Sequence, residues 1–189
     1  QKYSFEIGQI DGVISPRLSQ VKDVLRLVGG TTMLTNLMGI RWTKLLMNAT
    51  FSGMSAALGC TFGDVLHNPK AMICIAHIAD EAVKVCHASG YRMVEMNGAD
   101  LETLELSNDA DIPGKMALYN TVWGPHVKLK ASMLQDLEKG VKCEIDYING
   151  VVCRQGRKLG LATPYNDKVV ELVKSSEAAG KVNDMSALS

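Results

Sequence analysis

Three polar residues in a mostly apolar segment are the first candidates for chemistry. Within residues 40–58, Lys44, Asn48 and Ser52 recur at a spacing of four. In a helix this spacing places their side chains along one stripe, which drifts by about 40° per step. The stripe could be the solvent-facing edge of the helix. It could also line a cleft, because an amine, an amide and a hydroxyl suit the carboxylate, carbonyl and hydroxyl groups of a small oxo acid.

Two further candidates lie later in the chain. Ser132 precedes a helical run, so its hydroxyl could cap that helix or contact a ligand. Glu144 shares a face with Ile148 and Val151 in a predicted helix, which places its carboxylate on the apolar side. A carboxylate there needs a partner, and we expect Lys44 to be that partner. The simpler interpretation is that Glu144 stabilises the first turn of its helix, by roughly 0.3–1 kcal/mol.

Other kinds of site find little support in the sequence. The glycines match neither the G-x-G-x-x-G fingerprint nor a P-loop. The four histidines lack metal-ligand spacing, and Cys74 and Cys86 follow a helical period, so we expect core thiols and no metal. The cysteines number five, with no Cys-x2-Cys pair, which indicates a reduced, cytoplasmic protein.

The composition excludes several classes of protein. The chain has 189 residues, of which 47% are hydrophobic, and its 20 Lys+Arg balance its 20 Asp+Glu. A net charge of zero argues against a nucleic-acid partner and against a polybasic membrane-surface protein. The sequence also has no apolar run long enough for a transmembrane helix. An ordinary globular fold is expected.

The elements that must position the candidates divide into two parts. Residues 3–14 predict a strand, a turn at Asp11-Gly12 and the start of another strand, and a helix follows from Ser15-Pro16 to Gly29-Gly30. From about Leu34 the pattern becomes helical, with helices expected over 36–58, 69–90, 115–139 (interrupted at Gly124-Pro125), 144–159 and 164–178. We therefore expect a mainly α fold: a short β/α part at 1–32, then an all-α domain at 33–189.

Several motifs together carry a resemblance that covers nearly the whole chain. The most specific is Ser132-Met-Leu-Gln-Asp followed by Glu144-Ile-Asp-Tyr-Ile-Asn-Gly150, and it is supported by Trp42-x-Lys44-Leu-Leu-x-Asn48 and Gly160-x-x-Thr-Pro164-x-Asn166. With these motifs the chain resembles the carboxy-terminal part of the ketopantoate reductase (2-dehydropantoate 2-reductase) family.

The resemblance implies a fold and a reaction. The fold is an all-α domain of the 6-phosphogluconate dehydrogenase C-terminal-like type, which follows a Rossmann domain that holds NADPH. Residues 1–32 look like the last strands and helix of that Rossmann domain. The reaction is reduction of the 2-oxo group of ketopantoate to give pantoate. The matching positions are Lys44 as proton donor, Asn48 and Ser132 as substrate-binding residues, and Glu144 as the acidic residue that contacts cofactor or substrate near the nicotinamide. Ser52 is expected to bind substrate as well, although its residue type departs from the family pattern.

Two departures from the family pattern leave alternatives open. The family commonly has a second Asn four residues after the first, often followed by Pro, where this chain has Ser52 and Gly53. This puts the identity of the 2-oxo acid in doubt, so a related reductase for another 2-oxo acid is one alternative. The glycine fingerprint is also missing. We therefore expect the chain by itself to be inactive, and a non-enzymatic all-α dimerisation or binding module is the other alternative. Because family members are often dimers, a homodimer is an expected assembly.

Overall fold

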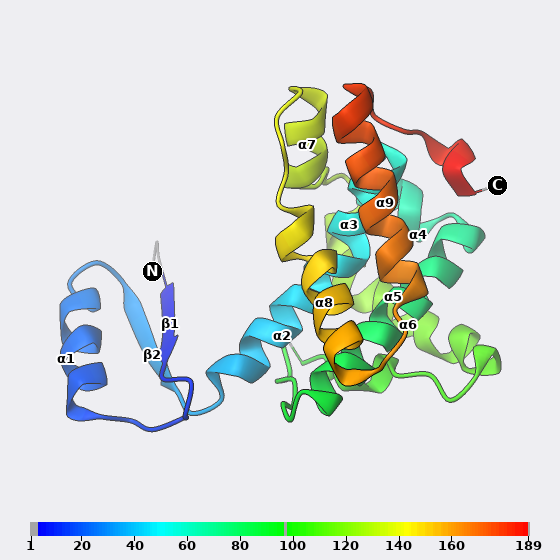
Figure 1. Ribbon diagram of the computed structural model, residues 1–189. Coiled ribbons are helices and arrows are strands. Elements are labelled where there is room, and N and C mark those ends of the chain that lie inside the picture. The colour runs from blue at the N-terminus through cyan, green and yellow to red at the C-terminus, as the bar shows by residue number, and fades with distance from the viewer. Residues whose placement is uncertain (1–3, 97, 189) are drawn as a thin grey trace.

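The computed structural model describes residues 4–96 and 98–188 and shows a small N-terminal lobe beside a helical bundle (Figure 1). The lobe contains β1 (Ser4–Gly8), α1 (Pro16–Leu25) and β2 (Gly30–Leu34). The two strands pair in parallel, with Ser4 opposite Gly30, and α1 provides the crossover that a parallel pair requires. The helix start predicted at Ser15-Pro16 is confirmed, because the Ser15 side chain accepts a hydrogen bond from the Leu18 backbone N–H.

The second strand of this lobe lies elsewhere than predicted. Residues 13 and 14 are not in a strand, and the partner of β1 is the segment 30–34. The predicted turn is present, with Gly12 at a φ of 75°. The sequence could not reveal the pairing because a parallel partner lies beyond a whole helix. β2 ends at Leu34, two residues past the predicted boundary at residue 32.

Helices dominate the rest of the described chain, which confirms the mainly α fold. The α-helices of the bundle are α2 (Leu37–Met47), α3 (Gly53–Leu58), α4 (Phe62–Leu66), α5 (Pro69–Ala88), α6 (Ile112–Trp123), α7 (Ser132–Glu138), α8 (Asn149–Leu159) and α9 (Pro164–Ala179). A π-helical turn, η1 (Asn48–Ser52), joins α2 to α3. Short 3-10 turns are η2 (Leu101–Leu104), η3 (Asp109–Asp111), η4 (Gly124–His126), η5 (Ile145–Tyr147) and η6 (Met185–Leu188).

The core of the bundle forms around α5. This helix contacts α2, α4, α6, α8 and α9, and its residues Ile75, Ile78 and Val83 are fully buried. Asn68 caps its first turn by accepting from the Ala71 backbone N–H. An aromatic cluster adds to the core, with the rings of Phe51 and Trp123 stacked at a centroid distance of 4.7 Å. The π-turn that carries Phe51 is therefore anchored in the centre of the domain.

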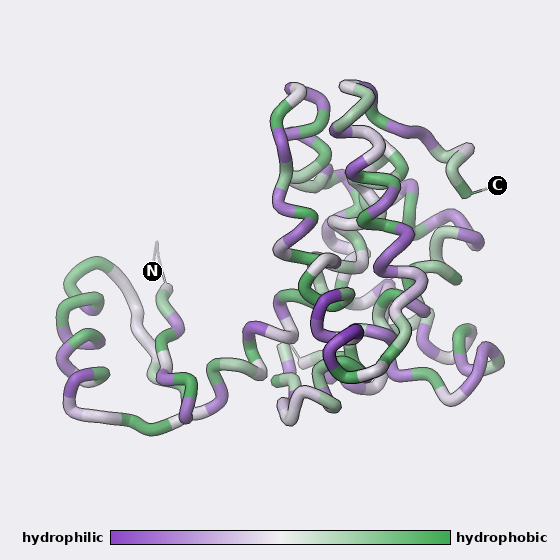
Figure 2. The backbone as a smooth tube through the Cα atoms, viewed as in Figure 1, coloured by the Kyte–Doolittle hydropathy of each residue, from purple (hydrophilic) through white to green (hydrophobic). Residues whose placement is uncertain are grey.

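The N-terminal lobe has almost no core of its own. Of residues 4–34, Leu18 is the one that is buried. Apolar side chains such as Leu27 and Val24 are 87% and 65% exposed, and hydrophobic stretches are visible along this lobe in Figure 2.

Within the described residues, no helix is both long and apolar enough to cross a membrane.

The structure corrects the start of one predicted helix and adds a short helix that was not predicted. The helix predicted to begin at Glu144 begins at Asn149, after the separate turn η5, although it ends at Leu159 before Gly160 as expected. Gly160 adopts a φ of 72°, the left-handed conformation that favours glycine at a helix C-terminus. The short helix α4 was not predicted, although Thr61 and Asp64 form a capping box that marks its start.

Candidate active site

The predicted stripe lies where α2 continues into the π-turn. Lys44 is in the last turn of α2 and is exposed, Asn48 opens η1, and Ser52 ends it; both of the latter are half-buried. In a regular α-helix a step of four residues exceeds one turn of about 3.6 residues, so the stripe would drift steadily forward. In a π-turn the hydrogen bond joins residues five apart, so one full turn takes more than four residues. The step from Asn48 to Ser52 therefore falls short of a full turn, and it offsets the drift from Lys44 to Asn48.

The hydroxyl of Thr50 helps to satisfy the backbone around this turn. It is fully buried, and its Oγ1 lies 2.9 Å from the carbonyl oxygen of Leu46 and 3.0 Å from that of Met47. Buried carbonyl groups without a partner are costly, and irregular helical turns disturb their usual pairing. Thr50 is therefore part of the local reason why the chain can form a π-turn here.

Ser132 does not cap its helix. It is the first residue of α7, and the capping position is occupied by Ala131, whose side chain makes no cap. The Ser132 hydroxyl instead donates to Glu144 Oε1 at 3.3 Å. The start of α7 is anchored to α3, because the Ala131 backbone N–H donates to the buried Ser55 Oγ at 3.3 Å. Ser132 is thus exposed on an anchored helix end, with its side chain turned towards Glu144.

The environment predicted for Glu144 was wrong in two respects. The residue precedes η5 and lies outside any α-helix, so the helical face shared with Ile148 and Val151 does not exist, and its side chain is exposed. The predicted ion pair with Lys44 is also absent from the described structure, where Ser132 is the partner of Glu144. The physical reason is that an exposed carboxylate is solvated by water and does not require a buried cation.

Contacts from α9 hold the segment that carries Glu144. The Cys143 backbone N–H donates to Glu177 Oε1 at 2.9 Å, and Lys174 Nζ pairs with Asp146 Oδ2 at 2.8 Å. The hydrogen bond from Lys174 lowers the pKa of Asp146, and the same bond raises the pKa of Lys174. These contacts fix the backbone on both sides of Glu144.

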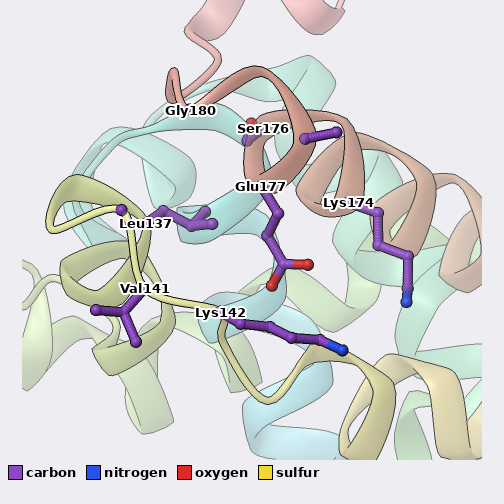
Figure 3. A pocket seen from close by; sticks show the side chains of 9 residues that line it. Leu137, Val141, Lys142, Lys174, Ser176, Glu177 and Gly180 are labelled. Atoms are coloured by element: carbon purple, nitrogen blue, oxygen red, sulfur yellow. The ribbon is translucent and has the colours of Figure 1, made fainter.

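A cavity of about 450 Å³ lies behind this segment, between the α7–η5 connection and the C-terminal end of α9 (Figure 3). Its lining includes Leu137, Val141 and Lys142, and the Glu177 side chain extends into it. The predicted site residues do not line this cavity. Glu177 already binds the Cys143 backbone N–H, and Lys174 already binds the Asp146 carboxylate. The residues that line this cavity therefore support the segment that carries Glu144.

The candidates form two groups, carried by elements that contact each other. Lys44, Asn48 and Ser52 share a continuous helical rod, while Ser132 and Glu144 share a hydrogen bond. α7 contacts both η1 and α3, which brings the groups towards each other. In Figure 1, α7 and the segment leading to α8 lie on the side of the bundle that faces the N-terminal lobe, where α2 enters. Within the described chain, no hydrogen bond or ion pair joins the two groups.

Cysteine nucleophiles and metal ligands find no support in the described residues. Burial raises the pKa of the Cys60 and Cys143 thiols to about 11, and that of Cys86 and Cys153 to about 12. Cys74, predicted as a core thiol, is half-buried, and burial raises its pKa as well. No group of three or more His, Cys, Asp or Glu side chains in residues 4–96 and 98–188 is arranged to hold a metal ion.

Comparison with known proteins places this chain in a family. Residues 36–177 match the family described as "Ketopantoate reductase PanE/ApbA C terminal". The 2-dehydropantoate 2-reductase of Archaeoglobus fulgidus is 27% identical over 173 residues, which are 91% of this chain and 52% of that protein. The chain therefore spans about half the length of this curated relative.

Solved structures agree on the fold. The PanE/ApbA family ketopantoate reductase of Ralstonia eutropha JMP134 superposes with a TM-score of 0.73 at 20% identity, over 93% of this chain and 51% of that one. D-mandelate dehydrogenase, solved with NADH and anilino(oxo)acetate, gives a TM-score of 0.71 at 25% identity, over 93% of this chain and 66% of that one. Because the family match covers most of the helical bundle, this chain belongs to the ketopantoate reductase family and contains its C-terminal domain.

Proposed function

We propose that this chain is the substrate-binding half of an NADPH-dependent reductase that converts the 2-oxo acid 2-dehydropantoate (ketopantoate) to pantoate. The observation that carries the proposal is the stripe of Lys44, Asn48 and Ser52, on a helix that enters the bundle beside the N-terminal lobe. Family membership supports the reaction class, and the stripe supplies the polar groups that a small 2-oxo acid requires.

Lys44 acts as the proton donor in this proposal. When a hydride reaches the 2-oxo carbon, negative charge develops on the carbonyl oxygen, and a nearby ammonium both stabilises that charge and supplies the proton. A nicotinamide cofactor, when bound, would supply the hydride, so the protein needs no nucleophile of its own. Lys44 has no ion-pair partner within the described chain, which leaves its N–H groups available to the substrate.

The other candidates bind and orient. The Asn48 amide and the Ser52 hydroxyl, half-buried on the same rod, donate to substrate oxygens. Ser132 donates to Glu144 and still has a lone pair with which to accept from a substrate hydroxyl. Glu144, held by that bond, accepts from an amide or hydroxyl near the nicotinamide.

The N-terminal lobe is, in this proposal, the end of the dinucleotide-binding domain. Two parallel strands and one helix are too small to be stable alone, and their exposed apolar side chains fit a surface covered by further strands and helices. Since the chain has no glycine fingerprint to hold a pyrophosphate, its predicted contribution to NADPH binding is Glu144. We therefore predict no detectable NADPH-dependent reduction by the 189-residue chain alone.

A related reductase for another 2-oxo acid is the second candidate. D-mandelate dehydrogenase, whose structure contains NADH and anilino(oxo)acetate, is 25% identical to this chain, against 20% for the ketopantoate reductase structure above. Ser52, which is shorter than the Asn commonly found there in the family, leaves room for a different side chain on the substrate. A panel of branched and unbranched 2-oxo acids separates the two candidates, because ketopantoate must be clearly the best substrate under the first.

The central test is Lys44→Ala in the full-length protein that contains this chain. We expect kcat to fall by about 10²- to 10⁴-fold, the usual contribution of a general acid, with an unchanged circular dichroism spectrum and melting temperature. Lys70, an exposed lysine on the different helix α5, provides the matched control, and Lys70→Ala should keep the activity of the wild type. Turnover near that of the wild type in Lys44→Ala would contradict the assignment. If the unmodified full-length protein reduces no 2-oxo acid, a non-enzymatic binding or dimerisation module becomes the better interpretation.

A further inference from the structure

A continuous series of buried polar side chains runs through the core behind the stripe. It starts at Glu81 on α5, passes through Asn166 on α9 and Asn149 on α8, and ends at the carbonyl oxygen of Ala49 in η1. The two asparagines are fully buried and Glu81 is 8% exposed. Buried polar groups are costly unless they are hydrogen-bonded, so a series that links four elements calls for an explanation.

The first half of the series fixes Asn166. The Glu81 carboxylate accepts from the backbone N–H groups of Tyr165 and Asn166, both at 2.9 Å, and so satisfies the first turn of α9. The Asn166 Nδ2 donates to Glu81 Oε2 at 2.7 Å and to the Ile78 carbonyl at 3.2 Å. With its amide nitrogen engaged in this way, Asn166 presents Oδ1 to Asn149 Nδ2 at 2.9 Å.

The second half replaces a hydrogen bond that the π-turn removes. In an α-helix the Gly53 N–H would donate to Ala49, four residues back, but here it donates to Asn48 and Thr50. The Asn149 Nδ2 donates to the Ala49 carbonyl instead, at 2.9 Å. The orientation of the Asn149 amide is set by its two acceptors, because the opposite orientation would place its oxygen against both.

Glycine at position 53 permits this approach. A Cβ atom there would lie 2.6 Å from Asn149 Oδ1, closer than van der Waals contact allows. Asn149 Oδ1 is itself buried and has no hydrogen-bond partner among the described residues. In this orientation Asn149 Nδ2 donates to the Ala49 carbonyl oxygen, while Asn149 Oδ1 stays without a hydrogen bond in the described part of the chain, which costs free energy.

From this geometry we infer that Asn149, held by Asn166 and Glu81, is a positioning residue that maintains the π-turn and thereby sets the direction of Asn48 and Ser52 relative to Lys44. The inference rests on the proposed function of the stripe. Without the Asn149 donor, the Ala49 carbonyl would compete for the Gly53 N–H and draw the turn towards α-helical pairing. The step from Asn48 to Ser52 would then drift forward, and Ser52 would turn further from the line of Lys44 and Asn48 along the helix.

The first test measures the turn itself by amide hydrogen exchange in the 189-residue chain. We expect Asn149→Ala to speed exchange at residues 51–54 at least about tenfold more than it speeds exchange in α5. Asn183→Ala is the matched control, since Asn183 also donates to a backbone carbonyl, that of Leu172, but does not contact the series. Equal changes at 51–54 in both variants would overturn the inference.

Gly53→Ala provides a second route to the same answer. The added Cβ should displace the Asn149 amide, so Gly53→Ala should also speed amide exchange at residues 51–54. This variant takes the place of Asn149→Ala if the latter does not fold. Combined with Asn149→Ala, it should cost less than the sum of the single effects on unfolding, because the clash disappears with the amide. Additive effects would contradict the proposed contact.

Kinetics of the full-length protein separate positioning from general stability. We expect Asn149→Ala to raise the KM for the 2-oxo acid about tenfold and to leave the KM for NADPH unchanged, because NADPH does not depend on the stripe. Unaltered exchange at 51–54 would overturn the inference if it is combined either with a parallel rise of the KM values for the 2-oxo acid and NADPH or with no rise in either. If exchange at 51–54 changes but the 2-oxo acid KM does not, the π-turn role stands and the proposed function of the stripe fails.

Discussion

Ser132 and Glu144 form a direct side-chain contact within the candidate site. The simpler interpretations of these residues were that Ser132 caps a helix and that Glu144 stabilises the first turn of one. Ser132 does not cap α7, and Glu144 lies outside a helix, so the local roles that could have explained these residues are not used. Their bond at 3.3 Å joins the start of α7 to the segment before η5. The sequence indicated both residues as candidates but did not reveal that they are partners. We expected Lys44 to pair with Glu144 on the assumption that Glu144 is buried, whereas an exposed carboxylate needs no cation.

Removal of the Ser132 hydroxyl tests this contact. We expect Ser132→Ala in the full-length protein to raise the KM for the 2-oxo acid about tenfold, as the loss of one hydrogen bond of roughly 1–1.5 kcal/mol implies, with a smaller effect on kcat. Gln135→Ala, an exposed position one turn further along α7, serves as the control. If the apparent affinity of Ser132→Ala is unchanged, Ser132 has no role in substrate binding.

Among the elements, the start of α9 depends on a carboxylate from a distant helix. Thr163 precedes the helix without a side-chain cap, and Glu81 of α5 accepts from its first backbone N–H groups instead. The sequence correctly predicts the helix from Thr163-Pro164, since proline favours the first helical position. The capping partner lies more than eighty residues away and leaves no local signal.

Burial raises the pKa of Glu81, and the hydrogen bonds from Asn166 and Tyr165 oppose that rise. A carboxyl group with a raised pKa in the folded state favours folding most while it is protonated. Its contribution is therefore fully present below the ordinary value of 4.5 and is lost as the pH rises from there through the raised pKa.

We thus expect the stability advantage of the wild type over Glu81→Gln to shrink as the pH rises above about 4.5, because glutamine stays neutral. Urea unfolding of both proteins at a series of pH values measures this difference. Glu171→Gln, at an exposed position on α9, is the control for general charge effects. An advantage that grows with pH would show that the hydrogen bonds outweigh burial.

For the whole molecule, the contrast between the two parts matters most. The bundle has a continuous core around α5, whereas the N-terminal lobe buries Leu18 and exposes Leu27, Val24 and Val28. Local stability follows buried apolar contact, so the two parts should open independently. The lobe gains a core only if further structure covers it, as its proposed place in a dinucleotide-binding domain requires.

Amide hydrogen exchange can test this proposal directly. In the 189-residue chain we expect exchange in β1, α1 and β2 to be at least roughly 100-fold faster than in α5. In the full-length protein the lobe should become protected, while α5 changes little. Equal protection of the lobe and α5 in the 189-residue chain would mean that the lobe is stable alone, and it would remove this argument for a covering domain.

The sequence by itself determined the helical fold and most helix ends, and its motifs indicated the family. These features depend on neighbours within about four residues: Ser15 and Asn68 cap their helices locally, and Gly160 ends one through its own backbone conformation. The tertiary structure decided the parallel pairing of β1 with β2, the Ser132–Glu144 bond and the series from Glu81 to Ala49. The Glu81–Asn166 bond spans 85 residues, and the Asn149–Ala49 bond spans 100. Such contacts are set by which helices pack together, so no local pattern could predict them, including the partner that satisfies the π-turn beneath the stripe.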